Sequence, residues 1–273
     1  RPIFIKGNKD FGLSKGVVNA PIIASVLGLY DSERLQSPMK KDKQSKWSSV
    51  DNEIRKALAA AKSVALISNT IISPTLKSSI DALKSSISGT FQHIQYDPIS
   101  YSAIRRANEL NFGRSFIPTY DFSKAKTIVS FGADFLSTWL MPTVYSCQYG
   151  EKRNPDGKWM SKHFQFESVM SVTGSNADYR AMTKPSEEES VLRYILARLN
   201  NSSIKPISKS LKSTADGAVK SLKETGKESL VVCGTNNTGI QQLVNEINNV
   251  LGANGTTIDI YNELNMFQSE EAK

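Results

Sequence analysis

The stretch of sequence that decides the fold reads SLVVCGTNNTG and runs from residue 229 to residue 239. It begins with a short apolar run, which is typical of a buried strand, and Gly234 then opens a turn. Farther on, Leu243, Ile247 and Leu251 recur at every fourth residue, as on one face of a helix. A strand that leads through a turn into an amphipathic helix is the repeating unit of a parallel α/β sheet.

The same unit recurs upstream. We predict further strands at 1–8, 64–67, 91–96, 126–131 and 257–261, with the strand at 64–67 buried. We predict helices at 21–30, 49–58, 73–87, 97–110, 137–149, 186–199 and 207–222. Ser49, Ser73, Asp97 and Ser186 carry the start signals of four of these helices, and Ser186 begins a capping box. The fold class is therefore α/β, with a mostly parallel sheet flanked by helices.

The chain divides into four regions by composition and periodicity. Residues 1–46 form an irregular entry segment whose polar part, 37–46, is a surface loop. Residues 47–200 form an α/β domain in which 150–185 is polar and without a clear period. Residues 201–228 are rich in lysine and serine and form a surface helix or linker. Residues 229–273 continue the α/β pattern, and we expect this last unit to be truncated.

The composition is that of a globular protein, with 39% hydrophobic and 22% charged residues. The net charge of +8 comes from lysines that are spread along the chain with few aromatic residues between them. This pattern favours solvated helix faces over a nucleic-acid groove, so we expect no nucleic-acid partner. No apolar run reaches the length of about 18 residues that a membrane span needs, so we expect no direct membrane span.

The potential metal ligands are few and isolated. Cys147, Cys233, His93 and His163 do not form the paired short spacings of a zinc site or the thiolate set of an iron–sulfur cluster. A disulfide between the two cysteines stays open, although Cys233 ends an apolar run and favours a buried thiol. We therefore predict no metal site and no redox centre in this chain.

Three predicted strands end in polar or glycine-rich turns, where open α/β sheets bind their ligands. The turns are Ser68–Thr70, Gly132–Asp134 and Gly234–Gly239. None matches the dinucleotide fingerprint or the P-loop, so each is either a tight structural turn or a nucleotide contact. Asp134 either binds a ribose hydroxyl or caps the following helix.

Two polar groups in 150–185 have both a chemical and a structural interpretation. Ser161–Ser168 contains a histidine, a carboxylate and hydroxyls, but no nucleophile elbow accompanies them, so a loop anchor is favoured over hydrolysis. Arg153, Arg180 and Lys184 either hold an anion or anchor the loop to main-chain carbonyls or to a partner chain.

Several stretches together resemble one family. They are RPIFIKGN (1–8), ASVLGLYDSER (24–34), Tyr96-Asp97 with Ala107-Asn108 and Phe112-Gly113, VSFGADFLSTW (129–139), and Glu167-Ser168 with SVTGSNADYR (171–180). In this order they resemble the large periplasmic subunit of bacterial alternative complex III. That subunit is a domain of the bis-molybdopterin oxidoreductase type fused to an iron–sulfur domain.

The resemblance implies a Rossmann-like sheet and a non-catalytic scaffold role in a respiratory quinol-oxidising complex. It implies iron–sulfur clusters in a separate domain, no molybdopterin here, and partners that include cytochrome c-type and integral membrane subunits on the periplasmic side of the inner membrane. It gives no catalytic residue. The candidate vestigial cofactor-pocket positions are Gly132, Asp134, Gly234, Thr235, Asn236 and Gly239.

Two alternatives remain open beside the scaffold. The chain could be a fragment of an active molybdopterin-dependent oxidoreductase, because such cofactors are held largely by main-chain groups. It could also be a nucleotide- or small-molecule-binding α/β module, since the turns after the strands suit either ligand.

Overall fold

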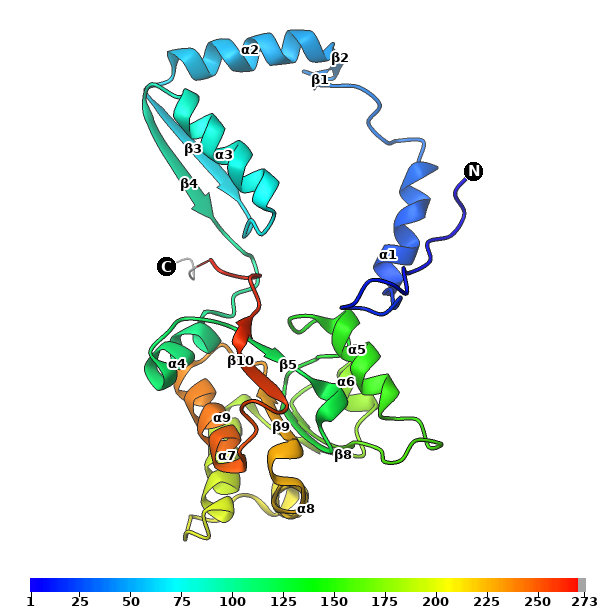
Figure 1. Ribbon diagram of the computed structural model, residues 1–273, viewed down its shortest axis with the longest axis vertical. Coiled ribbons are helices and arrows are strands. Elements are labelled where there is room, and N and C mark those ends of the chain that lie inside the picture. The colour runs from blue at the N-terminus through cyan, green and yellow to red at the C-terminus, as the bar shows by residue number, and fades with distance from the viewer. Residues whose placement is uncertain (270–273) are drawn as a thin grey trace. The chain divides into compact units, whose positions relative to one another are not determined.

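The computed structural model describes residues 1–269, which fall into two compact units (Figure 1). The large unit comprises Lys6–Val18 and Ala103–Leu264. The small unit comprises Arg1–Ile5, Asn19–Ser102 and Asn265–Lys273, of which residues 270–273 lie outside the described part of the chain. The four regions expected from the sequence stay a prediction.

A parallel sheet forms the centre of the large unit. Its strands are β6 (Thr127–Phe131), β7 (Lys162–Glu167), β8 (Tyr179–Met182) and β9 (Ser229–Cys233). They lie in the order β8-β7-β6-β9, and every neighbouring pair is parallel. With helices between the strands, this is a Rossmann-like α/β fold, and the predicted fold class is confirmed.

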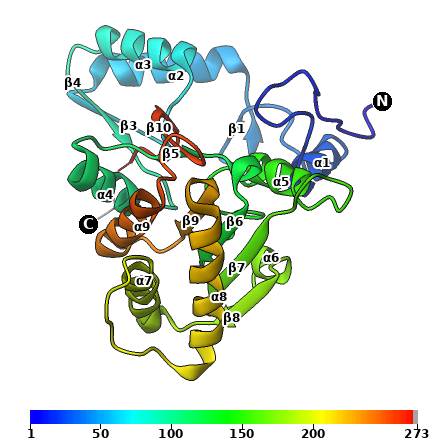
Figure 2. The same ribbon diagram turned by 60° about the horizontal axis from the view of Figure 1, so that its bottom comes forward.

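Helices and a second, antiparallel sheet complete the large unit. The helices are α4 (Ser102–Phe112), α5 (Pro142–Glu151), α6 (Val172–Ser175), α7 (Pro185–Leu199), α8 (Lys209–Thr225) and α9 (Thr238–Leu251), and α7, α8 and α9 lie together on one side of the parallel sheet (Figure 2). The antiparallel pair is β5 (Pro118–Tyr120) with β10 (Ile258–Glu263). The strand predicted at 257–261 therefore exists, but it does not extend the parallel sheet.

Strand register sorts the side chains of the parallel sheet onto two faces. Val129 of β6 is aligned with Phe164 of β7 and with Val231 of β9. Because residues two apart point the same way, the next aligned set, which contains Phe131 and Phe166, faces the same helices. The rings of Phe131 and Phe166 stack with centroids 4.8 Å apart. This face and helices α7, α8 and α9 enclose one hydrophobic core.

Helices α8 and α9 follow directly from the spacing of their apolar residues. Leu211, Ala215, Ala218 and Leu222 of α8 are all buried, which confirms the helix predicted in the lysine-rich segment. Its lysines remain on the opposite, solvated face. Helix α9 ends at Gly252, whose φ of 72° forms the left-handed C-cap that glycine adopts without strain.

The small unit contains a second pair of parallel strands, and few other residues pack on that pair. Its elements are α1 (Ala20–Ala24), a 3-10 helix (Ser25–Leu29), β1 (Met39–Lys40), β2 (Lys43–Gln44), α2 (Trp47–Ala60), β3 (Ser63–Ser68), α3 (Pro74–Ser86) and β4 (Thr90–Gln95). Strands β3 and β4 pair in parallel, and α3 runs alongside them (Figure 1). None of the residues 47–96 is buried, so this unit has no hydrophobic core of its own there.

Several sequence predictions are wrong in the small unit. The strand at 64–67 exists within β3 but is not buried, because only one of its faces is covered, and Ile67 remains 70% exposed. Residues 1–8 form no strand, since no neighbouring strand pairs with them. Asp97 starts no helix; its carboxylate instead accepts hydrogen bonds from the backbone and hydroxyl of Thr70. The loop at 37–46 contains the short hairpin β1-β2.

The structure also differs from the sequence predictions at two helix starts and in one polar segment. Helix α2 is preceded by Lys46 rather than capped by Ser49. Helix α7 begins at Pro185, one residue before the predicted Ser186, and Glu187 accepts the hydrogen bond from the backbone of Lys184. The polar segment 150–185 contains β7 and β8, because buried hydrogen bonds there replace the apolar residues that usually signal a strand.

Replacing Gly234 by alanine is expected to destabilise the large unit. A Cβ at Gly234 would lie 2.6 Å from the carbonyl oxygen of Gly132, and the backbone there is fixed by two parallel strands. We expect Gly234→Ala to lower the free energy of unfolding by about 1–3 kcal/mol in urea denaturation. Gly150→Ala in α5 is the control, because nothing lies within 4 Å of its added Cβ. That variant should leave stability unchanged or raise it slightly; equal losses at both positions would contradict the close approach.

Candidate functional site at the carboxyl edge of the parallel sheet

The strand order creates a switch point at the carboxyl edge of the parallel sheet. From β6 the chain proceeds to β7 and β8 on one side and then returns to β9 on the other. Connections that leave in opposite directions separate the loops after β6 and β9, and ligands of open α/β sheets bind at such places. Gly132 and Gly234 occupy the first positions of these two loops.

The two glycines bring the loop backbones close together. Gly132 has a φ of 58°, in the left-handed region that favours glycine, and its N–H donates to the carbonyl of Phe166 at 2.8 Å. The N–H of Gly234 donates to the carbonyl of Phe131, also at 2.8 Å. These bonds continue the sheet pattern for one residue beyond β6 and β9, so the loops leave from fixed positions.

A cavity of about 310 Å³ lies at this edge. Its lining comes from the loops after β6, β7 and β9 and from the start of α7. The lining residues are Gly132, Glu167, Ser168, Val169, Ser171, Thr183, Pro185, Glu188, Gly234 and Thr235. Of these described residues, none is lysine or arginine, and the polar groups are two carboxylates and four hydroxyls.

Glu167, the last residue of β7, is held as a carboxylate by several donors. Arg180 Nε donates to it at 2.6 Å, and the Ser171 hydroxyl donates at 2.7 Å. Burial by itself would raise the pKa of Glu167, but these hydrogen bonds outweigh it and hold the pKa below the ordinary value of 4.5. The negative charge of Glu167 is therefore compensated from within the protein.

Glu188, in the first turn of α7, has the opposite environment. Its side chain is buried, and its carboxyl group accepts a hydrogen bond from the Thr235 hydroxyl. Burial raises the pKa of Glu188 above 4.5, and the single neutral donor lowers it only in part. Two carboxyl groups with pKa values pushed apart thus line one cavity, an arrangement that suits paired acid and base roles.

A buried polar chain continues from Glu167 along β7. The Gln165 amide donates to Glu167 Oε2 at 3.1 Å, and Gln165 Oε1 lies 3.1 Å from His163 Nε2. Since Gln165 uses its amide toward Glu167, its oxygen accepts from the His163 ring. Burial lowers the pKa of His163 to about 4, so the ring is neutral at pH 7. The hydrogen bonds from His163 through Gln165 therefore hold the side chain of Glu167 in place.

The sequence candidates divide into two groups. Gly132, Gly234 and Thr235 line the cavity together. Asp134 does not line it: its carboxylate accepts from the backbone and hydroxyl of Thr173, at 3.0 and 2.7 Å. It also caps no helix after its own strand, because α5 begins only at Pro142.

Asn236 and Gly239 also lie away from the cavity lining. Asn236 Oδ1 accepts from the backbone N–H of Ala103 at 2.9 Å, which links the loop after β9 to α4. Gly239 lies in the first turn of α9. The site residue that sequence reasoning missed is Glu188, because its position in a helical first turn gives an ordinary capping signal.

Arg153 and Arg180 anchor the fold rather than an exogenous anion, whereas the role predicted for Lys184 stays a prediction. Arg153 forms two hydrogen bonds to the carboxylate of Asp178, at 2.8 and 2.9 Å, and one to the carbonyl of Ser161. Arg180 is paired with Glu167. The segment Ser161–Ser168 is strand β7 with its flanking residues, so its histidine and carboxylate belong to the buried polar chain.

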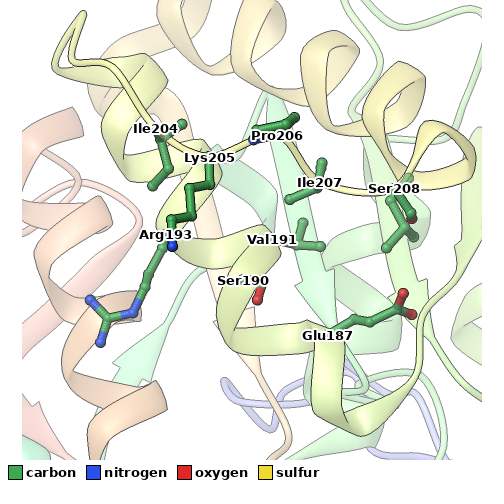
Figure 3. A pocket seen from close by; sticks show the side chains of 10 residues that line it. Glu187, Ser190, Val191, Arg193, Ile204, Lys205, Pro206, Ile207 and Ser208 are labelled. Carbon is green, nitrogen blue, oxygen red and sulfur yellow. The ribbon is translucent and has the colours of Figure 1, made fainter.

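A larger cavity of about 460 Å³ lies elsewhere in the large unit (Figure 3). It is formed by α7, residues 204–208 and Leu211 of α8, and none of these lining residues lies at a strand end. None of the predicted site residues lines it. Because size alone does not indicate chemistry, we treat the smaller cavity at the carboxyl edge as the candidate functional site.

Both cysteines are free thiols; Cys233 is buried, as expected, and burial raises its pKa to about 12. No group of three or more potential metal ligands converges among the described residues. Within residues 1–269, no helix combines the length and hydropathy that a membrane crossing requires.

Comparisons with known proteins identify no family. No protein-family model matches this chain, and no curated protein matches it. Among solved structures, it is similar to a chain of the formyltransferase/hydrolase complex (FhcABCD) from Methylorubrum extorquens, solved with methylofuran. The two chains are 12% identical with a TM-score of 0.47, and the match covers 76% of this chain and 55% of the other. The present chain thus spans about half the length of its solved neighbour, and a likeness of this degree says nothing about activity.

These comparisons correct the family prediction. The resemblance to the alternative complex III subunit and to molybdopterin oxidoreductases is contradicted: no family model matches this chain, and the solved structure found is one of a formyltransferase/hydrolase complex. The prediction of a scaffold function in a respiratory complex is contradicted together with this resemblance. The periplasmic location and the cofactor expectations rested on the same resemblance and stay predictions.

Replacing Glu188 by glutamine is expected to change how stability depends on pH. Glu188 has a raised pKa, so its stabilising contribution is complete below 4.5 and is lost as pH rises through the folded-state value. Glutamine does not titrate, so the variant does not lose this part of its free energy of unfolding as the pH rises. The free energy of unfolding of Glu188→Gln, relative to wild type, should therefore increase with pH in urea titrations between about pH 4 and pH 8. Glu246→Gln, an exposed position on α9, is the control. Parallel pH curves for Glu188→Gln and wild type would contradict the burial argument.

Proposed function

We propose that the large unit binds a small polar ligand carrying an amine at the carboxyl edge of its parallel sheet. The observation that supports this proposal is the lining of the 310 Å³ cavity, in which the acidic groups are the carboxyls of Glu167 and Glu188 and no basic side chain is present among the described lining residues. An ammonium group is the natural complement of such a lining, whereas a phosphate would meet two acidic groups and no cation from the described lining residues.

The two carboxyls contribute differently to this binding. Glu167 is already paired with Arg180 and fixed by Gln165 and Ser171, so it serves as a rigid acceptor. Glu188 lacks a cationic partner in the described structure, and an incoming ammonium would favour its ionised form. Below the folded-state pKa of Glu188, binding of the amine should thus be coupled to release of a proton from this side chain. The nucleotide contact considered from the sequence is disfavoured by the same charges.

Calorimetry with putrescine and with inorganic phosphate tests the proposal. Putrescine should give saturable heat. At pH 4.5, which lies below the raised pKa of Glu188, the size of this heat should depend on the ionisation enthalpy of the buffer because a proton is released. Glu188→Gln should weaken binding by about tenfold or more and remove the buffer dependence. Glu246→Gln should bind as wild type does. Heat with phosphate and none with putrescine would overturn the proposal.

We further infer that the small unit packs against a partner polypeptide. Ile67 and Ile94 are aligned across the β3–β4 pair, and they remain 70% and 38% exposed. A lone two-stranded pair with an apolar, uncovered face is marginal in water, so a partner surface would stabilise it. The finer prediction of cytochrome c-type and membrane subunits came from the corrected resemblance and is not part of this inference.

The same substitution in the two sheets tests whether the face of β3 is uncovered in the isolated chain. Ile67→Thr should change the free energy of unfolding by less than about 0.5 kcal/mol, because the side chain is exposed and threonine retains the β-branch. Ile128→Thr, in fully buried β6, should cost about 2–4 kcal/mol. Thermal unfolding of both variants measures the difference. A comparable loss at Ile67 would show that the chain covers this face itself, and the partner inference would fail.

A further inference from the structure

The larger cavity of the large unit has an apolar middle and two differently charged ends. Val191 of α7 and Leu211 of α8 form its base but are only 0% and 2% exposed, so the apolar surface open to a ligand belongs to Ile204 and Ile207. Its outer wall is the segment 204–208, which crosses α7 on its way to α8 (Figure 3). Ile207 lies next to Val191 and packs against the hydrophobic core (Figure 3). A volume of about 460 Å³ is within the range of small-molecule pockets.

The base of the cavity, Val191 and Leu211, is rigid, whereas the backbone of the outer segment has N–H groups that form no hydrogen bond within the described protein. Val191 and Leu211 are buried in helices that pack on the sheet, so their positions are fixed by the core. Among the described residues, the backbone of 203–207 forms no hydrogen bond with any protein group. Apart from Pro206, its N–H groups are available to a polar group of a ligand.

The charges at the two ends of the cavity are opposite. Lys205 extends along one end beside Arg193, and Glu187 lies at the other end near Ser208 (Figure 3). Arg193 is paired with Glu189 at 2.8 Å, but Lys205 forms no ion pair with any described residue. Glu187 accepts one hydrogen bond, from the backbone of Lys184, which leaves further acceptor capacity on its carboxylate.

We propose that this cavity binds an amphipathic zwitterion: a small ligand with a carboxylate at one end, an apolar chain in the middle and an ammonium at the other. The carboxylate pairs with Lys205 and the free N–H groups of the segment 204–208. The apolar chain lies on Ile204 and Ile207, and the ammonium pairs with Glu187. A fatty acid would place its apolar end against Glu187, and a nucleotide phosphate would leave the apolar middle uncovered, so both fit less well.

Methyl resonances of the full chain, labelled at isoleucine and valine, provide the test. Aminohexanoate should shift the signals of Val191, Ile204 and Ile207 to saturation. Hexanoate and hexylamine each lack one charged end, so each should bind about two- to fivefold more weakly, as expected for losing one exposed ion pair. Equal affinity of hexanoate and aminohexanoate, or no shift with aminohexanoate, would overturn the proposal.

Variants connect the shifts to this cavity. Lys205→Gln should reduce the affinity for aminohexanoate by about two- to fivefold and leave the affinity for hexylamine unchanged. Lys209→Gln, outside the lining on the same lysine-rich segment, is the charge-matched control and should bind normally. Ser190→Trp should fill the cavity from the exposed surface of α7 and abolish the shifts. Shifts that persist unchanged in both Lys205→Gln and Ser190→Trp would show that aminohexanoate binds elsewhere.

Discussion

The parallel pairing of β6 with β7 and β9 is the constraint on which the large unit depends. Register aligns Val129 with Phe164 and with Val231, so one face of three strands becomes continuously apolar. Helices must cover that apolar face to remove it from water, and α7, α8 and α9 do so. The same register brings the carboxyl ends of the strands to one edge. Both the core and the candidate site are thus consequences of one pattern of backbone hydrogen bonds.

The opposite face of β7 shows how a buried strand can be polar. His163, Gln165 and Glu167 alternate along this face and form hydrogen bonds to one another, which lowers the cost of burying them. Different partners explain the contrast within the cavity. Glu167 accepts hydrogen bonds from Arg180 and Ser171, which keep its pKa low, while Glu188 is buried with only the neutral hydroxyl of Thr235, and its pKa is raised. Burial and hydrogen-bond partners thereby separate the chemistry of two identical side chains.

The small unit uses the same parallel pairing with a different outcome. Strands β3 and β4 have the residue types and the connecting helix of a Rossmann-like unit, but two strands expose one face in full. Pairing alone therefore forms the strands without forming a core. The comparison shows that burial in this fold comes from the number of aligned strands and the helices that cover them, more than from the hydrophobicity of each strand.

The sequence by itself determined the elements whose signals are local: the spacing in α8 and α9, the apolar runs of β6 and β9, and the Gly252 cap. It also indicated the loops at the carboxyl edge, because glycine after a buried strand predicts a tight turn. Tertiary structure alone decided that β7 and β8 are strands, that the strand around Ile67 is uncovered, and that Glu167 and Glu188 share a cavity. The reason is physical: burial and hydrogen-bond partners come from residues distant in the chain. Short stretches that resembled another family reported only local pattern, and local pattern does not fix these long-range contacts.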